Sequence, residues 1–459
     1  MKYETKYEMK CTMIKNNDTT TIAMAKPIDF IMRGTRFHYA WIVLACIFLV
    51  LLTSAGIRAT PSVMILPLEH EFGWSRTTIS FIISVNIALY GLIGPFSAAA
   101  MQRYGIRPMV IGALLLLSSG TFASTFMTLP WHMVLIWGIV VGAGSGIAAN
   151  TLAATIVSRW FETRRGLAMG ILTASAATGQ MVFLPLMAYM VDHAGWRAVA
   201  LMVSGVAALA IPLVLVFLPE RPESIGLRRY GMPDITTGAQ KEDILPAQNP
   251  LMIALNALRK AIKIRDFWLL FFSFFVCGMS TNGYIGSHFI AMCSDYGISA
   301  VGGASLLATM GMLDLVGTTM SGWLSDRFNP RVLLFWYYGL RGVALLFLPH
   351  AFGLSYFGLP VFAFIYGLDW IATVPPTVRL ANDVFGRLSA PIIFGWIVAG
   401  HQLGAASATL LAGAMRNSIG SYTYSSMLMG TACIVAAVMV LRIQGHTMEH
   451  TLIGPTVKN

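Results

Sequence analysis

The sequence predicts an all-α integral membrane protein with twelve transmembrane helices in two six-helix bundles. Of its 459 residues, 56% are hydrophobic and 11% are charged, and the mean hydropathy is +0.69. Soluble domains carry about 25% charged residues. The apolar residues gather in stretches of about 20 residues or more, which is the length a helix needs to cross about 30 Å of hydrocarbon. The sequence lacks the short alternating segments of a transmembrane barrel.

The transmembrane helices are expected near residues 39–67, 78–100, 108–127, 131–157, 166–191, 198–218, 267–292, 301–324, 332–350, 355–378, 389–413 and 422–442. Lys and Arg favour cytoplasmic loops, so they test this assignment. Of the 31 Lys and Arg residues, 26 fall in the tails and loops on one side, and the loops on the other side hold only Arg76, Arg197 and Arg416. Both termini are therefore predicted to be cytoplasmic. The same asymmetry explains the net charge of +11, so no nucleic-acid partner is inferred.

The chain divides into two halves and a hinge. The predicted parts are a cytoplasmic tail (1–37), a six-helix bundle (38–218), a cytoplasmic linker (219–266), a second six-helix bundle (267–443) and a cytoplasmic tail (444–459). The motif "MQRYGIRP" follows the second span and "LSDRFNPR" follows the eighth, which places Arg103 and Arg327 at matching points 224 residues apart. Repeated bundles with a substrate site between them are typical of secondary transporters.

Several other classes of protein are disfavoured. The first 37 residues have no apolar core of the kind a cleaved signal peptide needs. Without a phosphate-binding loop, ATP-driven transport is not expected, and no nucleophile–base pair or H-E-x-x-H motif indicates an enzyme. No cofactor or metal site is expected, because the cysteines show no paired or metal-like spacing. They are Cys11, Cys46, Cys277, Cys293 and Cys433.

The motif "GWLSDRF" after the eighth span resembles the loop signature G-x-L-x-D-R of the major facilitator superfamily. The length, the six-plus-six spans and the central loop extend this resemblance over the whole chain. The copy in the first half departs from the signature, with Ala98 in place of Gly and Gln102 in place of Asp. In the family this Asp pairs with neighbouring helix ends and latches the outward-facing state. The resemblance therefore implies a latch at Asp326, Arg327 and Arg103 that is weaker in the first half.

A narrower resemblance lies at the fifth span. The stretch "RWFETRRGLAMGILTASAATG" resembles the monocarboxylate-transporter branch, in which an aromatic pair, two basic residues and L-A-x-G open this helix. The matching residues are Trp160, Phe161, Arg164, Arg165, Leu167, Ala168, Gly170, Ala174 and Gly179. The stretches "EFGWSRTTIS" and "RPESIGL" are typical of bacterial members, which implies a multi-pass protein of the cell inner (plasma) membrane.

A few ionisable residues lie well inside the predicted spans. They are Arg58, Asp314, Arg341, Asp369, His288 and His401. Such residues face the bundle interior or a water-filled cavity far more often than lipid. Asp314 lies 12 residues from Asp326 at the end of its helix, which is about 18 Å of rise. Arg341, Asp369 and His401 fall near the middles of their spans, so the sequence predicts a central site.

Arg58 is the candidate anion ligand. Its planar, permanently charged guanidinium suits bidentate binding of a carboxylate. In the resembling family, a basic residue lies in the equivalent part of the first helix. The residues also allow Arg58 to extend toward the membrane surface along Val63 and Ile65. Gly56 and Pro61 loosen the helix on either side, which favours a cavity.

Asp314 is the candidate proton-coupling residue, because it matches an Asp of the family's eighth helix. Transporters of higher animals carry an Arg four residues later, where this chain has Thr318. Arg341 on the next helix is a candidate partner for Asp314. A purely structural ion pair between Asp314 and Arg341 stays open as the alternative.

Asp369 and Trp370 are candidate substrate-binding residues, since Pro375 and Pro376 should break the tenth helix next to them. His401 is a third candidate, either relaying protons or binding an anion when charged. Each of these side chains could instead only hydrogen-bond to neighbouring helices.

These observations favour a proton-coupled secondary transporter of small organic anions that works by alternating access in the lipid bilayer. The expected partners are an organic anion, protons and lipid, and a monomer would suffice. An exporter of hydrophobic or cationic compounds is the alternative in the same fold, with a lining of Met279, Met310, Met312 and Trp370. A non-transporting membrane receptor is a third hypothesis, although no folded signalling domain is attached.

Overall fold

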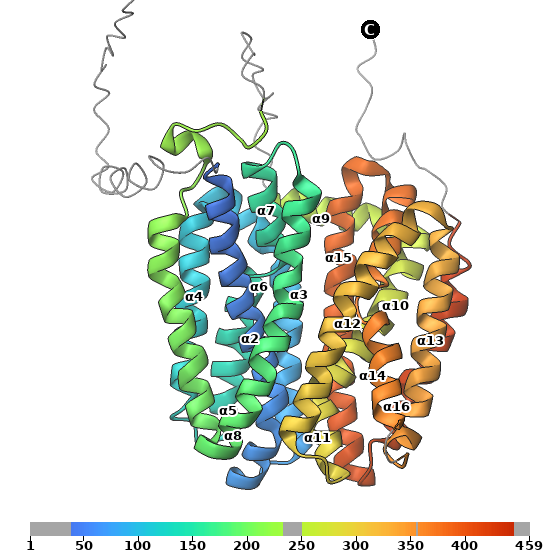
Figure 1. The fold of residues 1–459 in the computed structure, drawn as a ribbon. Helices are drawn as coiled ribbons and strands as arrows, with labels where there is room; N and C mark the ends of the chain where they lie inside the picture. The colour runs from blue at the N-terminus through green and yellow to red at the C-terminus, as the bar shows by residue number, and fades with distance from the viewer. Residues whose placement is uncertain (1–37, 233–249, 355–356, 445–459) are drawn as a thin grey trace, which may run out of the picture.

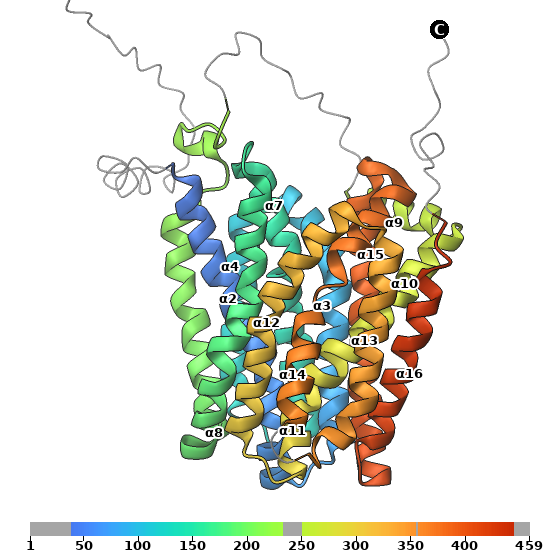
Figure 2. The same cartoon turned by 45° about the vertical axis from the view of Figure 1, so that its right-hand side comes forward.

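A computed structural model describes residues 38–232, 250–354 and 357–444, and it is almost entirely helical, which confirms the all-α prediction. Within these ranges there is no β-strand, only an isolated bridge between Phe161 and Tyr230. Two groups of helices stand side by side (Figures 1 and 2). We call the end of the bundle near residues 38 and 444 the tail face, and the opposite end the far face. The predicted tails and residues 233–249 of the linker lie outside the described residues.

The first half contains six spans. They are α2 (Ala40–Phe72), α3 (Arg76–Tyr104), α4 (Ile106–Ser124), a fourth span built from α5 (Pro130–Met133), η1 (Val134–Val141), α6 (Gly142–Ile147) and α7 (Asn150–Trp160), and two spans in α8 (Arg165–Phe217). A short helix η2 (Pro222–Ile225) and the helix α9 (Pro250–Ala261) follow on the tail face.

The second half repeats this plan. Its first span combines α10 (Arg265–Gly278), η3 (Met279–Ile285) and α11 (Gly286–Asp295), and the next two are α12 (Ala300–Arg327) and α13 (Pro330–Ala351). The fourth combines α14 (Gly358–Asp369) with the start of α15 (Val374–Ile419), the fifth is the rest of α15, and the sixth is α16 (Thr423–Val440). Ten of the continuous segments in the described ranges are long and apolar enough to cross a membrane. Counting α8 and α15 on both sides of their internal turns accounts for the twelve predicted spans.

Single glycines make both of these internal turns. Gly195 (φ 78°) separates the two parts of α8, and Gly386 (φ 73°) separates the two parts of α15. A positive φ of this size is unfavourable for residues with a Cβ atom, so glycine lets each chain segment reverse direction within one residue.

The fourth and tenth spans are interrupted at matching points of the repeat. The fourth span leaves helical geometry at Ala148 and Ala149, between α6 and α7. The tenth span breaks between Asp369 and Val374, and Pro375 and Pro376 lie in the first turn after the break. An offset of 224 residues carries Ala148 onto the second break, as it carries Arg103 onto Arg327. The predicted break of the tenth helix is therefore confirmed, and paired discontinuous helices are a feature of transporters built from repeats.

The two halves touch most closely where α3 lies along α15, and we call this contact the α3–α15 seam. The hydroxyl of Ser84 donates a hydrogen bond to the carbonyl of Ala406, and that of Thr77 donates to the carbonyl of Gly413 at 3.5 Å. A Cβ atom on Gly413 would collide with the side chain of Ser80, so the helices require a small residue there.

The apolar core differs between the two faces. Toward the far face, one cluster of buried side chains combines residues of both halves, such as Leu68 and Trp74 with Phe289. Toward the tail face the core divides into two separate clusters, one around Trp160 in the first half and one around Phe267 in the second. The halves therefore share one apolar core at the far face, whereas at the tail face their cores are separate.

Candidate functional site

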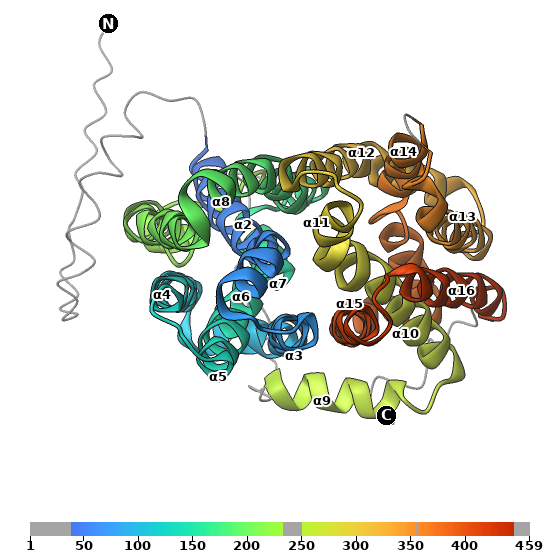
Figure 3. The ribbon, with the colours of Figure 1, turned by 90° about the horizontal axis from the view of Figure 1, so that it is seen from below.

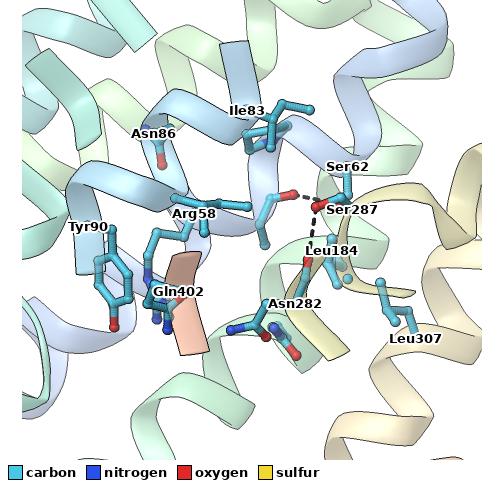
Figure 4. A pocket seen from close by; sticks show the side chains of 16 residues that line it. Arg58, Ser62, Ile83, Asn86, Tyr90, Leu184, Asn282, Ser287, Leu307 and Gln402 are labelled. Atoms are coloured by element: carbon cyan, nitrogen blue, oxygen red, sulfur yellow. Dashed lines mark hydrogen bonds between the residues drawn. The ribbon is translucent and has the colours of Figure 1, made fainter. Parts of the chain in front are cut away.

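Two adjoining cavities of about 160 and 70 Å³ lie between the two halves. The side chains that line both of them are Arg58, Tyr90, Gln180, Asn282 and Gln402. The first three come from α2, α3 and α8, and the other two come from η3 and α15. Figure 4 shows the smaller cavity, which reaches toward the far face and in which Arg58 extends toward Tyr90 and Gln402.

Arg58 carries an uncompensated charge into this space. Its guanidinium lies over the ring of Tyr90, with its carbon 4.7 Å from the ring centroid. The buried Nε atom has no hydrogen-bond acceptor, and no carboxylate of the described residues forms an ion pair with Arg58. Gly56, two residues before Arg58, makes room for the ring of Phe183, which packs closely against α2. The prediction that Arg58 faces a cavity agrees with this geometry.

Asp314 lies on the wall of the larger cavity that belongs to the second half. Only 4% of the residue is exposed, and its Oδ1 atom accepts hydrogen bonds of 2.8 Å from the hydroxyl of Thr318 and from the backbone N–H of Ile371. Thr318 therefore holds the carboxylate by a neutral hydrogen bond from its own helix. Arg58 and Asp314 line the same cavity from opposite halves without contacting each other.

Arg341 pairs with Asp369, so the alternative of an Asp314–Arg341 ion pair is wrong. Nε of Arg341 lies 2.7 Å from Oδ2 of Asp369, and both residues are buried. The reason is the break in the tenth span, because the carbonyls of Asp369 and Trp370 are freed there and accept hydrogen bonds from Nη2 of Arg341. The fork of donors on Arg341 bonds to these carbonyls and to one oxygen of the carboxylate, whereas Oδ1 of Asp369 is buried without a partner.

Neither Arg341 nor Asp369 lines either of the two cavities. Both were predicted as substrate-binding residues, and the structure places them one layer behind the lining. Cys277 stands between them and the cavity, since its thiol accepts a hydrogen bond of 2.9 Å from Nη1 of Arg341 and also lines the larger cavity. Sequence reasoning assigned Cys277 no role, because a lone cysteine carries no spacing signal.

Trp370 and His401 do line the larger cavity, as the sequence predicts. The ring of His401 lies 4.8 Å from that of Phe274, and its Nδ1 atom is buried without a partner. His288, in contrast, is hydrogen-bonded to the carbonyl of Thr409 and to the hydroxyl of Tyr422 and lines neither cavity.

Sequence reasoning missed the neutral amides of the lining. Asn282 and Gln402 contribute to both cavities, and Asn86 lines the smaller one. Asn282 belongs to η3, whose wider helical turn is a common feature of functional sites. An isolated amide within an apolar span was the available signal, and the search for ionisable residues passed over it.

An ion-pair cluster ties the two halves together at the far face. Arg76 at the start of α3 donates to both carboxylate oxygens of Asp295 at 2.8 Å and to Glu69 at 2.9 Å. Arg416 donates to Asp295 from α15, also at 2.8 Å, and the hydroxyl of Tyr422 lies 3.4 Å from Arg76. Sequence reasoning placed Arg76 and Arg416 only in loops. The bidentate contact between Arg76 and Asp295 closes the far face with a charge-assisted pair.

The predicted latch residues make no such contact at the tail face. Asp326 is exposed and has no ion pair or hydrogen bond to the residues that the structure describes, Arg327 lies over the ring of Trp323, and Arg103 lies over that of Tyr104. This agrees with a tail face at which the halves are apart, and the latch itself stays a prediction.

A different acid, Glu220, holds the tail face of the first half together. Its carboxylate accepts from the backbone N–H groups of Ile106 and Arg107 at the start of α4, and it lies 3.4 Å from Arg159. A carboxylate is favourable at a helix N-terminus. Glu220 belongs to the first half only, and it follows the sixth span in the polar stretch predicted as the linker.

The aromatic pair of the fifth-span signature has a packing role. Trp160 and Phe161 are fully buried, and the bridge between Phe161 and Tyr230 docks the segment after the sixth span onto them. Trp41 packs edge-on against both Phe161 and Tyr230.

A polar cavity between two six-helix halves, whose apolar cores join at one face and are divided at the other, is the architecture of a multi-pass membrane transporter. The family model of the major facilitator superfamily matches residues 46–390, and the chain belongs to this superfamily of transporters, which are not enzymes. The comparisons confirm the resemblance predicted from the loop and fifth-span motifs.

Two curated relatives illustrate the likeness. An "uncharacterized MFS-type transporter YcxA" of Bacillus subtilis (strain 168) is 25% identical over 86% of this chain and 92% of its own length. Monocarboxylate transporter 13 of Bos taurus is 25% identical over 88% of this chain and 89% of its own length.

Two solved structures share the fold. The D-xylose–proton symporter has a TM-score of 0.70 at 15% identity, covering 90% of this chain and 100% of its own. A bacterial homologue of the lysosomal transporter Spinster, solved in an inward-facing and unoccupied conformation, has a TM-score of 0.67 at 16% identity, with coverages of 89% and 96%.

We expect Asp369→Asn to destabilise the protein by about 3–5 kcal/mol, because it leaves the buried Arg341 cation without its carboxylate. Adding Arg341→Gln should recover at least half of this loss, since the amide still donates to the freed carbonyls. Thermal unfolding in detergent measures both effects, with the exposed Asp326→Asn as the control that leaves stability unchanged. Additive losses in the double variant would contradict the pairing.

Proposed function

We propose that the protein is a secondary active transporter of small organic anions, monocarboxylate-like and coupled to protons, that works by alternating access. The observation that carries this proposal is the unneutralised Arg58 in the cavity between the halves, with Asp314 on the opposite half. A partly buried guanidinium within a membrane span is costly without a carboxylate, and a substrate carboxylate would remove that cost. The curated relatives named monocarboxylate transporters support the same substrate class.

The two charges of the cavity provide a physical reason for coupling. In the empty cavity, the positive charge of Arg58 and the negative charge of an ionised Asp314 sum to zero. With an anion on Arg58 and a proton on Asp314, the sum is again zero. With only one of the two ligands bound, the cavity carries a net charge, which is unfavourable in surroundings of low dielectric constant. The halves would therefore rock when the cavity is empty or doubly loaded, which makes the cycle an electroneutral anion–proton symport.

Trp370, His401 and the amides of Asn282 and Gln402 would orient the rest of the substrate. Arg341 and Asp369 would act indirectly, by fixing the broken helix that presents Trp370 and the N–H group bound to Asp314. This role replaces direct substrate binding in the proposal.

The excess of Lys and Arg on the tail side supports a cytoplasmic tail face. The bacterial relative supports an inner (plasma) membrane location. With that orientation, the separated halves at the tail face correspond to an inward-facing state. The Arg76–Asp295 pair would then be an outer gate that breaks when the halves rock, and Asp326 would engage at the opposite face in the outward-facing state.

An exporter of hydrophobic or cationic compounds is the alternative. Asp314 and Trp370 in the lining suit a cation. The methionines predicted for that lining do not support it, since Met279, Met310 and Met312 line neither cavity. Arg58 would also repel a cationic substrate, so the anion proposal is favoured.

We expect Arg58→Gln to reduce uptake of labelled monocarboxylates into proteoliposomes at least about tenfold, because charge-assisted hydrogen bonds contribute about 1.5–3 kcal/mol each. Arg197→Gln is the matched control, since Arg197 pairs with Glu71 at the far face and lies outside both cavities. Undiminished uptake by a folded Arg58→Gln protein would rule out Arg58 as the anion ligand.

Asp314→Asn should abolish accumulation driven by a pH gradient while leaving exchange of substrate at equal pH. The amide imitates the protonated acid, so the loaded cavity stays neutral and moves, whereas the empty cavity keeps the charge of Arg58 and does not return. Counterflow and gradient-driven uptake in the same vesicles separate the two activities. Loss of both activities in a folded variant would argue against proton coupling at Asp314.

Asp295→Asn should increase access to the cavity from the far face, because it weakens the acceptor shared by Arg76 and Arg416. A cysteine introduced by Ser287→Cys in the smaller cavity of a cysteine-free protein reports this as faster labelling by a membrane-impermeant maleimide. Glu71→Gln is the control, since Glu71 and Arg197 form an ion pair on the same face within one half. Equal labelling rates with and without Asp295→Asn would show that the pair does not gate the cavity.

A further inference from the structure

The helix α9 lies outside the ring of transmembrane helices. Figure 3 looks along the spans, which appear end-on, whereas α9 is seen from its side at the edge of the molecule near α3 and α15. Figure 1 places the same helix at the tail face. Its axis is therefore parallel to the membrane plane, at the depth where the spans end.

Two indole groups fix α9 to the bundle. Nε1 of Trp396 on α15 donates to the carbonyl of Ala254 at 3.0 Å, and Nε1 of Trp268 on α10 donates to the carbonyl of Ile262 at 2.8 Å. Tryptophan is enriched at the boundary between hydrocarbon and water. The ring of Trp396 also meets that of Phe96 on α3 edge-on, at 6.0 Å between centroids. The helix is thus held at the membrane boundary, beside both halves.

The side chains of α9 form three faces at 100° per residue. Ala254 and Ala261 are buried against the bundle. Next to them runs an aliphatic stripe with the spacing of one helix face, and its members stay 37–40% exposed; they are Leu251, Leu255 and Ile262. The N–H of Ile262 bonds to the carbonyl of Leu258, so the helical geometry continues to the end of the stripe.

The third face carries basic residues. Arg259, and Lys263 in the turn that follows α9, lie beside the aliphatic stripe on the side away from the bundle, and both are exposed. The exposed Met252 lies between them on this face. No acidic residue occurs between Pro250 and Arg265. An aliphatic stripe flanked by basic residues is the pattern of a helix that lies in a membrane interface and attracts anionic lipid.

We propose that α9 is an interfacial helix that binds the anionic phospholipid surface of the leaflet at the tail face. Its aliphatic stripe enters the acyl region, and Arg259 and Lys263 contact the headgroups. A bilayer fits better than a protein partner because the stripe continues a lipid-facing surface, in which Trp268 is 41% exposed directly beside Ile262. This inference is independent of the substrate and of proton coupling.

The test measures lipid contact of the full-length protein in vesicles of phosphatidylcholine, alone or mixed with phosphatidylglycerol. A fluorophore is attached through Leu255→Cys on the stripe or, as the matched control, through Asn256→Cys one residue on, where the side chain points away from it. Lipids with brominated acyl chains quench a fluorophore that reaches the hydrocarbon. We expect quenching at position 255 to exceed that at 256 by at least about twofold in the mixed vesicles.

The double substitution Arg259→Gln and Lys263→Gln separates charge from burial. In mixed vesicles it should lower quenching at position 255 to the level seen in phosphatidylcholine alone, and in phosphatidylcholine it should change nothing. Equal quenching at positions 255 and 256 would overturn the proposal. Quenching at neither position would also overturn it, because it would show that water or a protein lies against the stripe. Quenching that is independent of phosphatidylglycerol and of the two basic residues would overturn anionic-lipid binding. A label through Ile262→Cys repeats the test if Leu255→Cys fails to fold.

Discussion

The guanidinium of Arg341 holds together a transmembrane helix that is broken at membrane depth. In the hydrocarbon region a freed backbone group cannot turn to water, so every group released by a break needs an internal partner. The carbonyls of Asp369 and Trp370 find it in Arg341, the N–H of Ile371 finds it in Asp314, and the carbonyl of Ala372 finds it in Ser321. The break thereby fixes where Asp314 stands and turns Trp370 toward the cavity. Asp369 balances the charge that this arrangement brings in.

The repeat is symmetric in its backbone and asymmetric in its charges. Both halves interrupt a span at matching points, near Ala148 and near Ala372. Among the side chains that the structure describes, buried ionic groups support the second break and not the first, whereas the first half contributes the isolated cation Arg58 to the shared cavity. The first half therefore offers a fixed positive charge that can bind an anion, and the second half offers a carboxylate that can bind a proton. This arrangement suits the transport of both ligands in the same step.

The sequence predicts the elements of this fold well because each span is encoded locally, by a run of apolar residues of the required length. It also places the helix break correctly, since Pro375 and Pro376 act on the backbone next to them. Partners across helices were harder to predict. Sequence reasoning considered Asp314 as the partner of Arg341, but Asp369 lies at similar depth, and the freed carbonyls beside it locate the guanidinium there. Arg76 and Asp295 are 219 residues apart, and no spacing pattern marks them as a pair.

The α3–α15 seam contains hydrogen bonds that must break when the two halves separate. The hydroxyls of Thr77 and Ser84 donate across it to carbonyls of α15. A serine or threonine in a helix can rotate and bond to a carbonyl one turn back in its own helix. Separation therefore lets the hydroxyl of Ser84 exchange one hydrogen bond for another, so that it keeps a partner in the hydrocarbon. Thr77 lies in the first turn of α3, at the far face, and has no carbonyl one turn back in its own helix. A seam built from apolar side chains with deep interlocking would resist sliding. At Ser84 the seam changes partners without losing a hydrogen bond, so the cost of parting the halves falls on the apolar cluster and the ion pairs that join them at the far face.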